Sequence, residues 1–240
     1  MPGSELRESI GAMVRLVAGA EEAALLGESG EDRARPGTPQ DWPLSALIAH
    51  STEFKSQQVV RLRAVLAGET RPSFAETDHT SSEIFHRFAR PNSDQVLAGS
   101  LSTTAELVHL LWDLPDSDLT DPGRNPWLHG RQLWLQVVVR GFWHPGGHLG
   151  EHWLSRGQGE RALRLHGSAV ALAEAVRLPR PALGMARYAL ACAMARVGRT
   201  EDAMTEVTLA VSLNSDLVQN AARDPDLAPV RALPGWTRSG

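Results

Sequence analysis

Cysteine is almost absent from this chain, since the 240 residues contain only Cys192. A single thiol excludes an intrachain disulfide and a metal cluster held by several cysteines. Cys192 lies in an alanine-rich segment, so we expect it to be a small core residue of a helix. The sequence therefore excludes disulfide-stapled scaffolds and cysteine-based zinc folds.

Long apolar runs are also missing. No stretch reaches the roughly 20 consecutive apolar residues that a membrane-spanning helix needs. The first eight residues do not show the positively charged segment and apolar segment of a secretion signal. We therefore expect a cytoplasmic protein without a membrane partner.

Lysine is scarce, and the basic residues are scattered along the chain. Lys55 is the only lysine, and 24 basic residues face 28 acidic ones, which gives a net charge of −4. Acids and bases are interspersed, so the chain lacks the basic footprint of a nucleic-acid-binding protein. The hydrophobic fraction of 42% is typical of a globular chain that buries a core. We expect no nucleic-acid partner.

Histidine is present in a pattern. The segment Gly141–Trp153 places His144, His148 and His152 at intervals of four. Residues four apart lie on the same face of a helix, so neighbouring imidazoles of this set can reach one metal ion or one substrate. Imidazole is the commonest metal ligand and titrates near neutral pH. The same spacing also occurs on ordinary half-buried helix faces, and the tryptophans in this segment indicate that it is partly buried.

Costly helix residues stand among these histidines. Pro145, Gly146 and Gly147 each disfavour a helix by about 1 to 3 kcal/mol. The proline also crowds the carbonyl four residues earlier, which belongs to Gly141. A sequence that keeps such residues at this place is shaped for a site more than for a uniform core.

Four long segments show the periodicity of amphipathic helices, and no segment alternates as a strand does. They cover residues 4–27, 41–67, 93–112 and 131–155. Ser4 and Asp41 are the expected N-caps. Apolar residues expected to face inward include Ile10, Met13, Val14, Val17, Leu62, Val96, Leu101, Leu107, Leu111, Leu133 and Val137. We predict an all-α fold in which residues 1–158 form an up-down four-helix bundle.

A further histidine lies on the second predicted helix. His50 falls on the apolar face of that helix, and Glu53 lies three residues on. A buried histidine is often a hydrogen-bonded structural residue, and an acid on a helix is often a solvated one. In a bundle, however, His50 can converge with His144 and His148, and Glu53 can orient an imidazole or act as a base.

The texture changes after Gly159. Residues 159–240 form the second predicted domain, in which segments 183–197 and 200–213 show the spacing of one tetratricopeptide-type hairpin. One hairpin is too short for a free-standing solenoid. It is either a plain helical extension or a peptide-binding element, and it can pack on the bundle or on a second copy of the chain. A homodimer is therefore a possible partner state.

Two stretches resemble a known superfamily. Trp42–His50 resembles the second helix of the DinB/YfiT-like four-helix bundles, and His144–His148 resembles the H-x3-H motif of their fourth helix. The resemblance implies that the metal ligands are His50, His144 and His148. His152 is extra to the motif, as a residue behind the ligands or on the surface.

The stretches Glu83–Phe85 and Leu119–Gly130 resemble the ClbS/DfsB-type branch of that superfamily, and residues 183–231 resemble the tetratricopeptide-like tail of some members. The superfamily implies metal-dependent thiol transferases or isomerases that use a low-molecular-weight thiol such as mycothiol or bacillithiol. The ClbS-type branch implies self-resistance, by opening the cyclopropane of a DNA-damaging natural product without a necessary metal. Other members are damage-inducible or stress-linked proteins.

These expectations combine into one hypothesis. The bundle holds zinc or nickel on three histidines with an open position, which is the catalytic pattern. It hydrolyses a small electrophilic molecule or adds a thiol to it. Glu53 or His152 serves as a base or orients a ligand. The residues expected to line the substrate pocket are Trp42, His79, Trp127 and Trp143. The alternatives are a non-catalytic small-molecule binder and an interaction protein that captures a partner with its tail.

Overall fold

The computed structural model describes residues 3–29, 37–38, 41–69, 86–87 and 92–236. The protein is all-α, as predicted. Within these residues the only β-type pairing is an isolated bridge between Thr38 and Asp41. None of the described helices has the length and apolarity to cross a membrane. The chain divides into two compact units, Met1–Leu149 and Gly150–Gly240, which are called the first and the second unit below.

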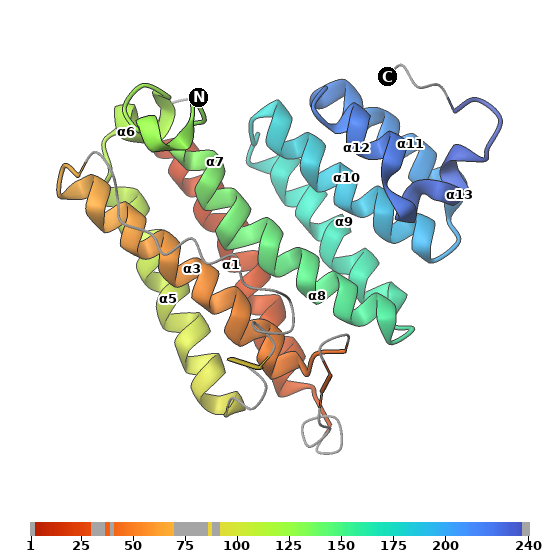
Figure 1. The fold of residues 1–240 in the computed structure, drawn as a ribbon, viewed down its shortest axis with the longest axis horizontal. Coiled ribbons are helices and arrows are strands. Elements are labelled where there is room, and N and C mark those ends of the chain that lie inside the picture. Colours follow the sequence, from red (N-terminus) through yellow and green to blue (C-terminus); the bar gives the residue numbers. More distant parts are fainter. Residues whose placement is uncertain (1–2, 30–36, 39–40, 70–85, 88–91, 237–240) are drawn as a thin grey trace. The chain divides into compact units, whose positions relative to one another are not determined.

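Long helices of the first unit lie side by side (Figure 1). The elements of this unit are α1 (Gly3–Leu26), α3 (Leu44–Leu66), α5 (Ser93–Asp113), α6 (Asp116–Thr120), η1 (Pro126–Leu128), α7 (Leu133–Val138), the π-helical turn η2 (Val139–Trp143) and the start of α8 (His144–Ser155). Helix α5 packs on α3 and on α1, and η2 packs on both α1 and α3. Nine of the apolar residues predicted to face inward are fully buried: Ile10, Met13, Val14, Val17, Leu62, Leu107, Leu111, Leu133 and Val137.

Helix ends differ from the prediction at two caps. Helix α1 begins at Gly3, so Ser4 lies inside its first turn. Asp41 does not cap α3, because Pro43 takes the N-cap position and Asp41 pairs its backbone with Thr38 instead. The end of α3 follows the prediction, since Gly68 comes directly after the C-cap with a φ of 77°, which only glycine adopts without strain.

Leu101 is the one predicted inward residue of α5 that is wrong. Its side chain is 38% exposed, while its neighbour Ser100 is buried. The polar face of α5 is turned inward because it meets Lys55, the single lysine of the chain. The Lys55 ammonium donates to Ser100 Oγ at 2.8 Å and to Thr104 Oγ1 at 3.4 Å.

Lys55 also forms an ion pair across the core. Its Nζ lies 2.7 Å from Glu21 Oε2, and the two side chains are only 1% and 2% exposed. Ser100 Oγ donates to the same carboxylate oxygen at 2.9 Å. The network therefore joins α1, α3 and α5 at one point, and each of the three ammonium hydrogens has an acceptor.

The second unit contains the end of α8 and the helices α9 (Gly159–Ala175), α10 (Arg180–Arg196), α11 (Thr200–Leu213), α12 (Leu217–Arg223), η3 (Pro225–Leu227) and α13 (Ala228–Arg231). Helix α10 packs against α9 on one side and α11 on the other. Small residues at their contacts, Ala191, Ala203 and Ala210, are fully buried. The sequence places the domain boundary at 158/159, whereas the compact units meet inside α8, after Leu149.

We expect Lys55→Met to lower the free energy of unfolding by about 3–5 kcal/mol, because the Glu21 carboxylate then stays buried without its cation. Arg63→Met is the matched control, since Arg63 is also on α3 and pairs with Glu106 of α5, but with side chains 63% and 34% exposed. Its effect should stay within about 1 kcal/mol. Urea unfolding followed by circular dichroism measures both. If both substitutions lowered the free energy of unfolding equally, the buried pair would not stabilise the first unit more than the exposed pair does.

Candidate metal centre

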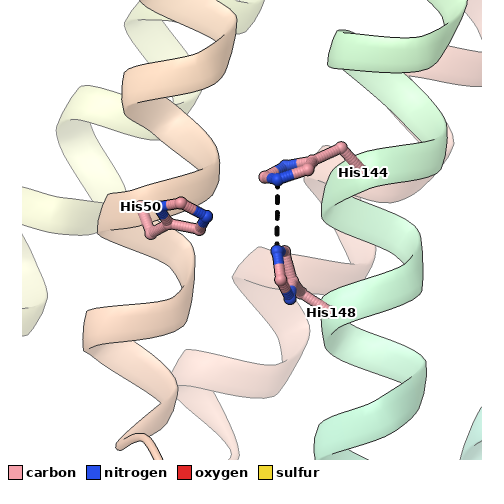
Figure 2. Close-up of side chains that lie close together, drawn as sticks. All are labelled: His50, His144 and His148. Carbon is pink, nitrogen blue, oxygen red and sulfur yellow. Dashed lines mark hydrogen bonds between the residues drawn. The ribbon is translucent and has the colours of Figure 1, made fainter. Parts of the chain in front are cut away.

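Three histidines predicted as ligands meet in the first unit. His50 comes from the second turn of α3, and His144 and His148 come from the first two turns of α8 (Figure 2). The ring centroid of His50 lies 5.1 Å from that of His144 and 5.2 Å from that of His148. One ring nitrogen of each residue lies within 4.8 Å of those of the other two. Residues nearly 100 positions apart are thus gathered at one point.

A π-helical turn places the α8 histidines. Pro145 has no backbone N–H, and its ring would crowd the carbonyl of Gly141 in a regular helix. The chain widens directly before it, and His144 N–H donates to the carbonyl of Val139, five residues back. Such single π turns are frequent at functional sites. The helix therefore continues through the proline.

Gly141 allows this turn to approach its neighbours. A Cβ at this position would lie 2.9 Å from a methyl carbon of Val14 and 3.0 Å from one of Leu107. Both distances are too short for a side chain in a packed core. The glycine thus lets η2 lie directly against α1 and α5. This close contact fixes the position of η2, and with it the position of the histidines that follow in α8.

The donor set fits a divalent metal ion. The Nε2 atoms of His144 and His148 are 3.2 Å apart. Two nitrogens bound to one tetrahedral zinc, each at 2.0–2.1 Å, lie roughly 3.3 Å apart. The same distance fits a hydrogen bond in which one ring donates and the other accepts. Three imidazoles are a donor set that suits zinc or nickel, and they leave at least one coordination position for another molecule.

The site favours the neutral form of His50 and His144. Burial, together with the neighbouring His148, lowers the pKa of His50 to about 4. Burial lowers the pKa of His144 to about 3, with contributions from His148, His50 and Arg140. Metal ions bind the neutral ring, so these two ligands lose no proton when a metal binds at neutral pH.

Aromatic rings surround the histidines. Phe54 stacks on His144 with a centroid distance of 4.0 Å, and its ring meets His50 at 4.8 Å. Trp42 lies 5.5 Å from His50 in an edge-on arrangement. Phe54 follows His50 by four residues and therefore shares its face of α3.

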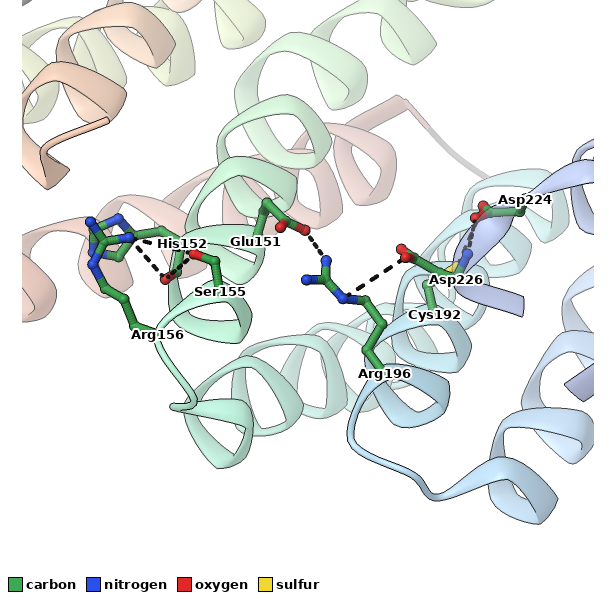
Figure 3. Close-up of polar contacts among 8 residues, drawn as sticks. All are labelled: Glu151, His152, Ser155, Arg156, Cys192, Arg196, Asp224 and Asp226. Atoms are coloured by element: carbon green, nitrogen blue, oxygen red, sulfur yellow. Dashed lines mark hydrogen bonds and ion pairs between the residues drawn. The ribbon is translucent and has the colours of Figure 1, made fainter. Parts of the chain in front are cut away.

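The two acid–base candidates lie outside the three-histidine group. Glu53 is on α3, and its carboxylate contacts the guanidinium of Arg87 at 3.5 Å. His152 is on α8, one turn after His148, and is buried. The hydroxyl of Ser155 donates to its backbone carbonyl at 3.1 Å (Figure 3).

The predicted pocket residues are spread over several elements. Trp42 precedes α3 and contacts His50, as described above. Trp143 is the last residue of η2, next to His144 in the chain, and Trp127 belongs to η1. His79 lies outside the described residues.

A second group of possible donors lies in the second unit. Donor atoms of Cys192, Asp224 and Asp226 also come within 4.8 Å of one another (Figure 3). Here the contacts describe a structural network. Tyr188 donates to Asp224 Oδ2 at 2.8 Å, Cys192 Sγ lies 3.7 Å from the same oxygen, and Asp226 N–H donates to Asp224 Oδ1 at 3.0 Å.

Burial raises the pKa of Cys192, and the two carboxylates raise it further, so the thiol stays protonated. Cys192 is half-buried. Its side chain packs against the apolar core of the second unit and also lies next to Asp224. The network caps η3 through Asp224 and ties α10 to the turn that follows α12.

No protein-family model, no curated protein and no solved structure matches this chain. The site is therefore interpreted from its own geometry.

We expect the metal-free protein to lose stability as the pH falls from about 6.5 towards 4. The unfolded chain binds protons at its histidines near pH 6.5, whereas His50 and His144 resist protonation in the folded state until about pH 4 and 3. The unfolded state thus holds more protons in this window, so the free energy of unfolding decreases. Each unit of difference in pKa corresponds to about 1.4 kcal/mol.

Urea unfolding at a series of pH values measures this dependence. A double variant, His50→Gln with His144→Gln, should show a flatter decrease of the unfolding free energy over the same window. The same slope in the variant and the wild type would contradict the assignment of the pH dependence to these two rings.

Proposed function

We propose that the first unit is a DinB-like metal-dependent enzyme that acts on a small electrophilic molecule, by hydrolysis or by transfer of a thiol. The observation that carries this proposal is the convergence of His50, His144 and His148 from two helices, with the rings of His50 and His144 neutral at physiological pH. Three protein ligands with a free position are typical of catalytic zinc sites, whereas structural zinc sites are usually closed by four.

A divalent metal bound here would supply Lewis acidity and would lower the pKa of a water or a low-molecular-weight thiol. His50, His144 and His148 would hold the ion. Phe54 and Trp42 cover the rings with apolar surface, which keeps bulk water from the ligands.

A base must receive the proton that such a nucleophile loses. Glu53 and His152 are the candidates from the sequence. Glu53 is the nearer of the two to His50 in the chain, three residues along α3, and its carboxylate contacts Arg87. We assign this role to Glu53.

The superfamily resemblance extends the proposal to the whole chain. It makes the first unit a four-helix bundle and the α10–α11 pair a tetratricopeptide-like hairpin. A self-resistance or detoxification role follows from the ClbS-type stretches. The buried alanines between α10 and α11 suit the close helix pairing of such hairpins.

A second function is favoured by one observation. The 3.2 Å contact between His144 and His148 is also satisfied by a hydrogen bond between two neutral imidazoles, which needs no metal. Under this alternative the site binds a hydrophobic small molecule without metal, and Trp42 and Phe54 supply contact surface. The protein then protects stoichiometrically and does not turn over.

We expect wild-type protein, purified without a histidine tag, to bind about one equivalent of zinc or nickel. His148→Ala should abolish this binding because it removes one of three ligands. His152→Ala is the matched control, one turn along the same helix, and should keep the metal. Inductively coupled plasma mass spectrometry measures the content, and circular dichroism checks that each variant folds.

The outcomes separate the two functions. Metal lost in His148→Ala and kept in His152→Ala supports the enzyme. If the wild type holds no metal, even after incubation with zinc, the metal-dependent enzyme is excluded and the metal-free small-molecule binder is supported. Multiple turnovers of an electrophile with a thiol, lost in His148→Ala, would exclude the stoichiometric binder.

A further inference from the structure

We infer that Phe54 is a positioning residue of the three-histidine centre, which holds the His144 ring in the orientation that faces His50 and His148. This inference rests on the proposed function. The Phe54 ring lies nearly parallel to His144, with an interplanar angle of 20° and a centroid distance of 4.0 Å. The same ring meets His50 at 66° and 4.8 Å. One side chain therefore contacts two candidate ligands that come from different helices.

The His144 ring needs such a support. A histidine that binds metal through one nitrogen usually donates its other N–H to a carboxylate or a carbonyl, which fixes the ring. Nδ1 of His144 is buried and has no hydrogen-bond partner among the described residues. Stacking on Phe54 supplies the orientation that a hydrogen bond would otherwise give.

Phe54 is itself held from a second side. The guanidinium carbon of Arg140 lies 5.0 Å from the centroid of the Phe54 ring, within the range of a cation–π contact. Arg140 Nη1 also donates to Gln57 Oε1 at 3.3 Å, three residues along α3 from Phe54. Arg140 precedes His144 by four residues through the π turn. Arg140 thus contacts the phenyl ring from η2, the turn directly before His144, and is itself hydrogen-bonded to Gln57 of α3.

The helix spacing makes this arrangement continuous. His50, Phe54 and Gln57 are related by four and three residues, so they share one face of α3. Arg140, His144 and His148 form the opposing row on η2 and α8. Phe54 lies between two candidate ligands, His50 and His144, and the guanidinium of Arg140. Its contact with Arg140 therefore helps to fix the orientation of the ring that stacks on His144. Loss of its ring should loosen His144 and leave the α3 backbone intact.

The test uses cobalt(II) as the probe, measured by competition with a chelator. Phe54→Leu removes the ring and keeps apolar bulk, and it should weaken cobalt binding by about 10- to 100-fold, the usual effect of losing a residue that orients a ligand. It should also change the visible absorption of the bound cobalt, which reports ligand geometry. Phe54→Tyr keeps the ring and should bind cobalt with the wild-type affinity and spectrum.

Phe142→Leu is the matched control. Phe142 is a core phenylalanine of the same unit, 4% exposed, on the turn before His144. This substitution makes the same chemical change and should lower stability while keeping cobalt affinity. Unchanged affinity in Phe54→Leu would overturn the inference. So would equal losses in Phe54→Leu and Phe142→Leu, or a loss in Phe54→Tyr as large as in Phe54→Leu.

A metal-free readout separates this inference from the proposed function. In NMR spectra of the apo protein, the stacked phenyl ring should shift the carbon-bound ring protons of His144 upfield. Phe54→Leu should remove this shift and broaden the signals as the ring samples several orientations, whereas Phe142→Leu should not. If the wild type binds no cobalt, the metal-dependent function falls and the NMR result alone decides the role of Phe54. Unchanged His144 signals in Phe54→Leu would overturn it.

Discussion

The buried ion pair between Lys55 and Glu21 is the contact on which the first unit depends. It fixes α3 against α1 and α5 in a core from which water is excluded. Lys55 follows His50 by five residues, which is about 140° around a helix. The face that carries His50 therefore points elsewhere, towards the start of α8. Because the ion pair sets the rotation of α3, it also sets where His50 meets His144 and His148.

Burial acts in opposite ways on the Lys55–Glu21 ion pair and on the candidate ligands His50 and His144. The lysine keeps a partner for its charge, since a buried charge without one is very costly. The histidines instead lose their charge, because burial lowers the pKa of His50 and His144 far below the usual value. The same buried interior thus gives the first unit a fixed ion pair and two neutral candidate ligands, His50 and His144. A metal site needs the second condition as much as it needs geometry.

The π turn before Pro145 connects helix chemistry to the site. Proline removes a hydrogen bond, and the wider turn from Val139 to Trp143 absorbs that loss without ending the helix. Gly141 lets the turn lie against α1 and α5. The costly residues around the histidines are consequently explained by the placement of the rings. In the second unit, Asp224 fixes the start of η3, because it accepts hydrogen bonds from Tyr188 and from the backbone of Asp226.

The sequence by itself determined the all-α class, the approximate helix bounds, most of the apolar core and the three histidines of the centre. These follow from a periodicity that each helix carries within itself. It did not reveal that Lys55 is buried, that Leu101 is exposed, or that Phe54 stacks on His144. Each of these depends on what another helix presents to the same face. Lys55 meets residues 34 to 49 positions away, and Phe54 meets one 90 positions away. Only the tertiary structure decided such pairs, because helix periodicity says which residues share a face and not which face a neighbouring helix covers.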